Sequence, residues 1–228
     1  MIVRDATSKV TRLLTGRAGA GIFDATTLDE QRHYVRTRFP RWRWHLVLLL
    51  LGNSTALNSL LYKGEFPRKN IDSSHFSIYQ TIFDRLFNEQ MAKASFFLQM
   101  VFLGHVPHSE GYPVECRKDV FSQAKVALAD CHIDYVEGDV FEAAARQDRT
   151  IDFLSLSDVP SFLPASAEAG FLQHVRPGLA KDALVVVRAH LRRPYPTLND
   201  YVDVSHQHPA AALQESTKLW SFHMYKTA

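Results

Sequence analysis

IDFLSLSDVPSFL, residues 151–163, begins as an apolar strand and ends in small polar residues followed by a proline. Ser155, Ser157 and Asp158 gain no burial at the end of such a strand, so their place there needs another explanation. In open α/β sheets, ligands bind in the crevice outside the carboxyl ends of the strands. The stretch therefore predicts the wall of a site, in which a buried strand delivers these side chains to the carboxyl edge of a sheet.

Strand and helix patterns alternate on both sides of this stretch, from Pro113 onward. The helical patterns cover residues 119–131, 140–147 and 166–179, and the strand patterns cover 132–139, 150–158, 183–191 and 218–227. Strands and helices that alternate at this spacing are typical of βαβ units. We therefore predict an α/β fold with a mostly parallel sheet in this half of the chain.

The chain before Pro113 has a different hydrophobic pattern, because apolar residues recur at helical intervals from Asp29 to Leu103. Its most apolar run, residues 46–51, is well short of the ~20 residues that a membrane-spanning helix needs. The glycines of residues 16–21 follow a helical pattern rather than a strand, so a flexible turn is favoured over a dinucleotide loop. We expect a helical part, 1–110, and an α/β part, 111–228, in one compact unit.

Composition limits the class of protein. The chain has 228 residues, enough for one large domain, and its formal net charge of +2 is too small to favour a nucleic-acid partner. Cys116 and Cys131 are too few and too isolated for a disulfide framework or a zinc site, so no metal is expected. A reduced, cytoplasmic location is the default for such a chain, and no secretory signal is visible at its start.

The charge is unevenly distributed along the chain. The segment from Gln31 to His45 holds five arginines and no acidic residue, namely Arg32, Arg36, Arg38, Arg41 and Arg43. One interpretation is a solvated helix face rich in arginine. The other is a docking surface for an anionic partner, either lipid headgroups at a membrane surface or an acidic protein.

Three features of the second half occur in a recognisable order. One predicted strand ends in Gly138-Asp139, the next ends in Ser157-Asp158, and a helix then leads through RPGL, residues 176–179, to a strand that carries Arg188. This order resembles the second half of a class I S-adenosylmethionine-dependent transferase. The resemblance implies that Asp139 sits by the adenine amine, which can donate a hydrogen bond to a carboxylate.

A narrower resemblance rests on four stretches of the chain: RFPRWRWHLVLLLLGNSTALNSLLYKGEFPRKN (38–70), ASFFLQMVFLG (94–104), FLSLSDVPSFL (153–163) and VVVRAHLR (185–192). They are similar to the S-adenosylmethionine:diacylglycerol 3-amino-3-carboxypropyltransferases, which make the first intermediate of betaine lipids, and to uncharacterised relatives. The resemblance covers roughly residues 28–228. It implies a class I, Rossmann-type fold in which about residues 25–110 form a helical insertion.

Carried over by position, the family pattern assigns a role to five residues of the α/β part. Gly138 and Asp139 become the cofactor loop for S-adenosylmethionine, and Ser157 and Asp158 lie near the reacting centre. Arg188 becomes the candidate for the methionine carboxylate, which its planar guanidinium can bind through two hydrogen bonds. Two alternatives stay open: Arg188 forms a structural ion pair, and the Ser157-Asp158 pair caps a helix that follows.

The chemistry of the transfer suggests further roles. Asp158 is a candidate general base or orienting group for the acceptor, and Tyr79 or His75 of the helical part could assist it. The acceptor would be a lipid such as diacylglycerol or a small molecule, and the product methylthioadenosine.

One departure from the family pattern concerns the methionine end of the cofactor. The glycine-rich turn expected before the helical insertion is absent, unless residues 16–21 replace it. Glu115 could mimic the ribose-binding acid, since a helix follows it, but no glycine turn precedes it. Three functions therefore stay open: the aminocarboxypropyl transferase, a methyltransferase, and an incomplete or split-enzyme subunit. In the last case a partner chain or a second copy would cover the exposed edge of the sheet.

Overall fold

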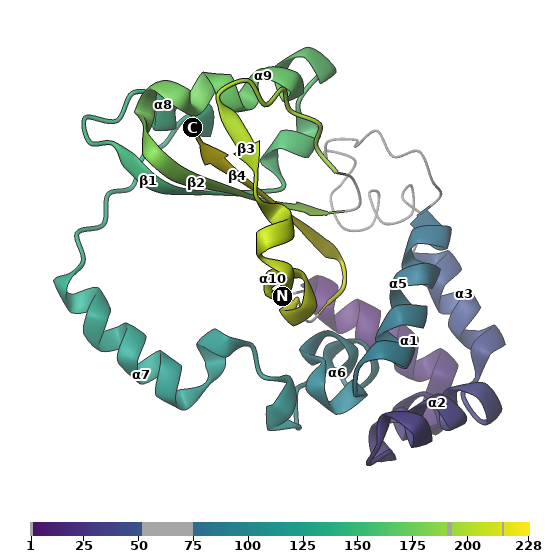
Figure 1. Ribbon diagram of the computed structural model, residues 1–228. Helices are drawn as coiled ribbons and strands as arrows, with labels where there is room; N and C mark the ends of the chain where they lie inside the picture. Colours follow the sequence, from purple (N-terminus) through teal and green to yellow (C-terminus); the bar gives the residue numbers. More distant parts are fainter. Residues whose placement is uncertain (1, 52–74, 191–192, 216) are drawn as a thin grey trace. The chain divides into compact units, whose positions relative to one another are not determined.

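The computed structural model describes residues 2–51, 75–190, 193–215 and 217–228, and these form two compact units (Figure 1). The first unit contains the described residues up to Cys131 together with Thr217 and Lys218. The second contains the described residues from His132 to Glu215 and from Leu219 to Ala228. The division into parts 1–110 and 111–228 stays a prediction.

The first unit is built from helices, as its sequence pattern predicted. They are α1 (Ile2–Ala20), α2 (Leu28–Thr37), α3 (Arg41–Leu51), α5 (His75–Glu89), α6 (Phe96–Phe102) and α7 (Lys118–Ala127). Helix α1 continues through most of the glycine-containing stretch that was predicted as a flexible turn, and only Gly16, at φ 57°, leaves the helical conformation. Aromatic rings fill the core, where Trp44 lies 4.6 Å from Phe83 and 5.0 Å from Phe102 between ring centroids.

Two buried glutamines connect the helices of this unit to its loops. The Gln31 side chain donates to the carbonyls of Phe87 and Gln90 and accepts the Ala92 N–H at 2.7 Å. Gln99 makes the same kind of contacts with the backbone around His108. Because buried polar groups are stable only when they are hydrogen-bonded, these amides hold the loop backbone in place.

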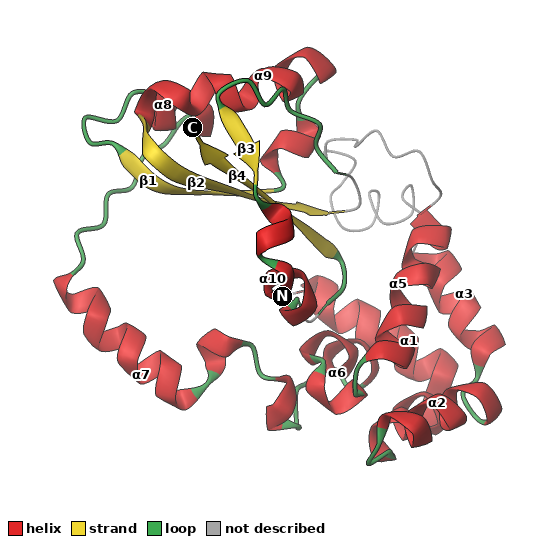
Figure 2. Cartoon of the chain, viewed as in Figure 1, coloured by secondary structure: helices red, strands yellow, loops and turns green. Residues whose placement is uncertain are grey.

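The described part of the second unit contains a four-stranded sheet with helices, a mixture of helix and strand that is compatible with the predicted α/β class (Figure 2). Its strands are β1 (Ile151–Ser157), β2 (Leu179–His190), β3 (Tyr201–Asp203) and β4 (Trp220–Thr227), in the order β1-β2-β4-β3. The prediction of a mostly parallel sheet is wrong at the level of strand pairing. Only β1 and β2 pair in parallel, because β4 lies between β2 and β3 and is antiparallel to both.

Helices α8 (Val140–Ala145) and α9 (Ala165–Val175) both cover one face of this sheet (Figure 2). A short helix, α10 (Pro209–Gln214), precedes β4. The core between the helices and the sheet consists of Phe141, Ala144, Leu156, Phe171, Leu172, Val175, Leu179, Ala183, Val185, Val187, Tyr201 and Tyr225. Alternate residues of β2 enter this core, which fixes the face that every strand residue presents.

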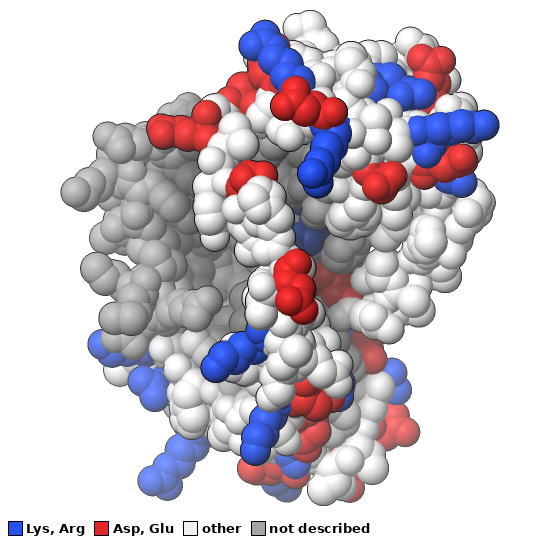
Figure 3. All heavy atoms as spheres, turned by 90° about the vertical axis from the view of Figure 1, so that its left-hand side faces the viewer, with Lys and Arg blue, Asp and Glu red and all other residues white. Residues whose placement is uncertain are grey.

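The strand predicted over residues 132–139 is not formed. Ile133, Tyr135 and Val136 lie in an extended loop with at least half of their side-chain surface exposed. Strand-forming residues need a neighbouring strand to complete their hydrogen bonds, and within the described residues β1 pairs only with β2. Helix α7 likewise buries none of its residues. On the face shown in Figure 3, which is the left-hand side of the view in Figure 1, basic and acidic side chains are interspersed.

Candidate functional site

The carboxyl ends of the parallel strands β1 and β2 bring Ser157 and Arg188 together. The two residues are register partners, and the Arg188 guanidinium donates to Ser157 Oγ at 3.3 Å. The sequence predicted Ser157 for the carboxyl edge because it ends a buried strand, and the family resemblance assigned Arg188 to the same site. The structure places them side by side at that edge.

Trp220, the first residue of β4, adds an aromatic ring to this pair. The guanidinium carbon of Arg188 lies 4.7 Å from the centroid of the Trp220 ring, and the His190 ring lies 4.9 Å from it. A cation held over an indole face is stabilised by the ring's negative charge density. Arg188 is exposed, and within the part of the chain that the structure describes it pairs with no carboxylate. Its N–H groups are thus oriented and can bind an anion.

Asp158 connects the tip of β1 to the end of β2. Its Oδ1 accepts the Ser161 hydroxyl at 2.7 Å and the His190 backbone N–H at 2.9 Å. Its own N–H donates to the Arg188 carbonyl at 2.8 Å. The residue has φ 26°, a conformation in which a side chain other than glycine's is strained. Asp158 precedes the short 3₁₀ turn Val159–Phe162, but its side chain makes no capping hydrogen bond to that turn, so the alternative of a helix cap is not supported.

Gly138 and Asp139 lie at the start of α8, away from that cluster. Asp139 is the N-cap of α8, and its Oδ1 accepts the N–H groups of Phe141 at 2.8 Å and Glu142 at 3.1 Å. No hydrogen bond or ion pair of the described structure joins either residue to Ser157, Asp158 or Arg188. The predicted cofactor residues are therefore split into two groups within the second unit.

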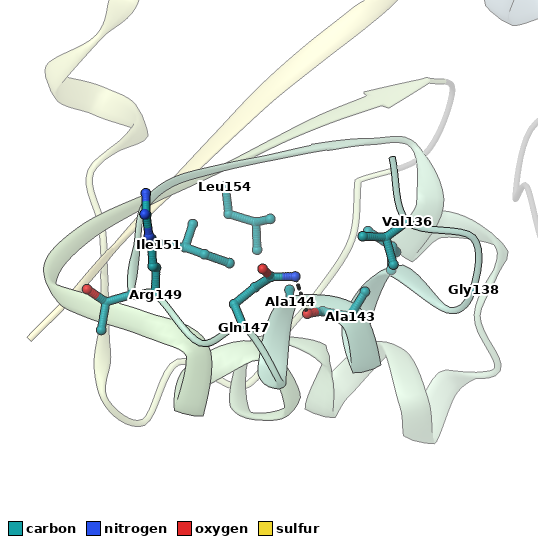
Figure 4. Close-up of a pocket in the computed structure, with 10 residues that line it drawn as sticks. Val136, Gly138, Ala143, Ala144, Gln147, Arg149, Ile151 and Leu154 are labelled. Carbon is teal, nitrogen blue, oxygen red and sulfur yellow. Dashed lines mark hydrogen bonds between the residues drawn. The ribbon is translucent and has the colours of Figure 1, made fainter. Parts of the chain in front are cut away.

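The two residues also border different hollows. Gly138 lines an open hollow of about 420 Å³ beside α8 and the start of β1, with Val136, Gln147 and Ile151 among its other walls (Figure 4). Asp139 lines a second hollow, between α8 and α9, whose wall includes Leu163 and His174. Neither hollow is lined by Ser157, Asp158 or Arg188.

Tyr79 and His75 belong to helix α5 of the first unit. Tyr79 is half-buried there, and the side chain of His75 falls outside the described part of the structure. The other candidates all belong to the second unit.

Several polar residues at the carboxyl edge were not predicted for the site. They are His190 and Trp220, which are register partners on one face of the sheet, and Ser221 and His223, which lie on the opposite face because side chains alternate along β4. The Ser221 hydroxyl lies 2.9 Å from His223 Nε2, and burial lowers the pKa of His223 to about 4. The sequence signals only a strand here. Which residues of β2 face Trp220 and Ser221 depends on an antiparallel register that no local pattern specifies.

Comparisons with protein-family models, curated proteins and solved structures gave no match to the chain. Among the residues that the structure describes, no three His, Cys, Asp or Glu side chains are placed to hold a metal ion. None of the described helices is long and apolar enough to cross a membrane. The functional assignment accordingly rests on the geometry of the site.

Proposed function

We propose that the chain is an S-adenosylmethionine-dependent transferase that moves the 3-amino-3-carboxypropyl group to a lipid or small-molecule acceptor. The observation that supports this most is Arg188, which Ser157 and Trp220 hold at the carboxyl edge of the sheet. A guanidinium fixed in this way suits the carboxylate of the transferred group, because both are planar and can pair through two hydrogen bonds.

The reaction needs alignment more than acid–base catalysis. S-adenosylmethionine supplies a γ-carbon that is already activated by its sulfonium leaving group. The acceptor oxygen or nitrogen forms the new bond to this carbon, the carbon–sulfur electron pair leaves with methylthioadenosine, and the acceptor proton is lost. A residue that fixes the carboxylate fixes the γ-carbon three bonds away, and such positioning can supply much of the rate.

The other candidate residues take supporting roles in this proposal. Asp158 holds the strand tips at a fixed distance through its bonds to Ser161 and His190, so it positions Arg188 and the acceptor rather than acting as a free base. Asp139 would receive the adenine amine on the carboxylate oxygen that does not cap α8, with Gly138 beside it.

The test is the identity of the product. The purified chain is incubated with S-adenosylmethionine and vesicles that contain diacylglycerol, and the nucleoside product is measured by mass spectrometry. Methylthioadenosine is expected, and S-adenosylhomocysteine would instead identify a methyltransferase. Arg188→Lys keeps the charge but loses the planar fork, so we expect it to lower product formation at least 10-fold, as does Arg188→Met. Trp220→Phe should retain most of the activity and Trp220→Leu should not.

A second candidate function is a subunit that acts only with a partner. The outer edge of β1 pairs with no other strand of the described chain, and such edges are usually covered. Under this alternative the purified chain forms neither nucleoside product. Methionine carries the same carboxylate as the transferred group, and any binding of methionine should be equal in the wild type and in Arg188→Met.

A further inference from the structure

Helix α3 is apolar on two opposite sides, and only one of them is buried. Trp44, Val47 and Leu48 face the core of the first unit and are at most 4% exposed. The opposite side carries four large apolar side chains with exposed fractions of 64%, 41%, 52% and 57%, namely Trp42, Leu46, Leu49 and Leu50. A helix that is hydrophobic all round is normally buried all round. The exposed side therefore needs an occupant.

These four residues form one continuous surface, which we call the outer ridge. They follow the spacing i, i+4, i+7 and i+8, which places them on the same face of an α-helix. The apolar residues of α3 from Trp42 to Leu50 are thus divided between the core side and the outer ridge. An apolar surface of this kind on one helix marks an interaction site more often than chance exposure of single side chains.

Positive charge surrounds the start of the outer ridge. Arg41 and Arg43 precede and follow Trp42, so they project on either side of it, and both are exposed. The Arg43 guanidinium lies 5.1 Å from the centroid of the Trp42 ring. Arg36 and Arg38, at the end of α2, are exposed as well. No acidic residue occurs between Gln31 and the end of α3, in contrast to the interspersed charges of the face in Figure 3.

This combination fits an anionic membrane surface better than an apolar protein partner. Helices that lie in the plane of a membrane have an apolar side with Trp and Leu and a border rich in Arg or Lys. Each basic residue near an anionic leaflet adds attraction, and the arginines here have no acidic neighbours in the segment to offset that attraction. We propose that the outer ridge of α3 enters the headgroup region of an anionic bilayer while these arginines contact the lipid phosphates and carboxylates.

The proposal goes beyond the transferase function and does not require it. Binding to a lipid surface can be measured without S-adenosylmethionine and without turnover. If the chain binds vesicles but forms no nucleoside product, the membrane surface stands and the transferase proposal fails. If methylthioadenosine forms but the chain does not bind anionic vesicles, the transferase proposal stands and the membrane surface fails.

The first experiment is co-sedimentation of the full chain with vesicles of phosphatidylcholine alone or mixed with phosphatidylserine. We expect binding to the mixed vesicles that weakens as salt is raised, and little binding to phosphatidylcholine. The double substitution Leu46→Ser with Leu49→Ser should lower the partition coefficient about 10-fold or more, and Arg41→Ala with Arg43→Ala several-fold. Phe121→Ser with Leu128→Ser is the matched control, because these exposed residues lie on and next to α7, and it should bind like the wild type.

A second measurement begins with the unaltered protein. Lipids brominated on their acyl chains quench tryptophans that enter the bilayer. Trp42 should be quenched, and its loss in Trp42→Phe should abolish the quenching, because Trp44 is buried in the core. Binding that is equal for both vesicle types, or unchanged by the ridge substitutions, overturns the proposal. A dimer that the Leu46→Ser/Leu49→Ser variant dissociates, without vesicle binding, would assign the ridge to a protein contact.

Discussion

The carboxylate of Asp158 accepts the backbone N–H of His190 at 2.9 Å, so a side chain at the tip of β1 fixes the end of β2. The same oxygen accepts the hydroxyl of Ser161 at 2.7 Å. Arg188 lies two residues before His190 on β2, and its orientation therefore depends on this link. The candidate site is built on a rigid corner of the sheet rather than on a loose loop.

Replacement of Asp158 by alanine should destabilise the second unit. Two hydrogen bonds to a charged oxygen are lost, and we expect the free energy of unfolding in urea to fall by about 2–4 kcal/mol. Asp158→Asn should retain most of the stability, because an amide oxygen can accept the same two donors and asparagine tolerates positive φ. Asp152→Ala, an exposed position on the same strand, is the control and should change little. Equal stability of Asp158→Ala and Asp152→Ala would remove the structural role given to Asp158.

The two roles of Asp139 can be separated by substitution. Asp139→Ala removes the N-cap of α8 and should lower stability by about 1 kcal/mol, whereas Asp139→Asn should keep the cap. If Asp139 also contacts adenine, both variants should weaken S-adenosylmethionine binding measured by calorimetry, the alanine variant more. Asp139→Ala that loses stability but binds S-adenosylmethionine like the wild type would leave the residue with the cap alone.

Gly178 lies where the turn before β2 meets α8. A Cβ built on Gly178 would overlap the carbonyl oxygen of Ala144, which is backbone and cannot move aside. Gly178→Ala should therefore lower the free energy of unfolding by about 3–5 kcal/mol, which is at the upper end of the effects of point substitutions. Gly170→Ala is the matched control, because no atom lies within 4 Å of its Cβ. In the middle of α9 it should stabilise the unit by about 0.5–1 kcal/mol.

His223 should make the stability of the second unit depend on pH. Burial lowers its pKa from 6.5 to about 4, so the unfolded chain binds more protons than the folded chain between these values. The contribution of neutral His223 to stability is complete above about pH 6.5 and is lost as the pH falls toward 4, by about 3 kcal/mol in all. Urea midpoints measured across this range should show a slope that His223→Gln reduces. An unchanged slope in that variant would assign the pH dependence to other groups.

Local pattern was enough to predict the elements whose apolar residues meet the core. The strand over Ile151–Ser157 and the helix around Phe171 and Val175 were both expected, and their residues Leu156, Phe171 and Val175 lie in the core. The place of Ser157 at the carboxyl edge also followed from its strand, whereas Arg188 was assigned to the site by the family resemblance alone. Residues 132–139 show the opposite case. Ile133 and Tyr135 have strand propensity, but propensity forms no strand unless the segment pairs with another strand.

What could not be predicted depends on contacts between distant parts of the chain. The short strand Tyr201–Asp203 contains too few residues to give a periodic signal, and it exists because it pairs with β4. Trp220 reaches Arg188 only because β4 enters the sheet antiparallel to β2, in a register that aligns Trp220 with His190. Asp158 and Asp139 were expected to face a ligand, but the carboxylate of each also accepts hydrogen bonds from backbone N–H groups.

The position of β4 has a consequence for synthesis of the protein. This strand follows β1, β2 and β3 along the chain, yet it lies between β2 and β3 and supplies the pairing partner of both. As the chain leaves the ribosome, β3 has no neighbour to join and β2 presents an open inner edge until residues 220–227 emerge. The sheet can therefore close only after its central strand has been made, and for that interval the nascent chain exposes an edge that a chaperone or another nascent chain could bind.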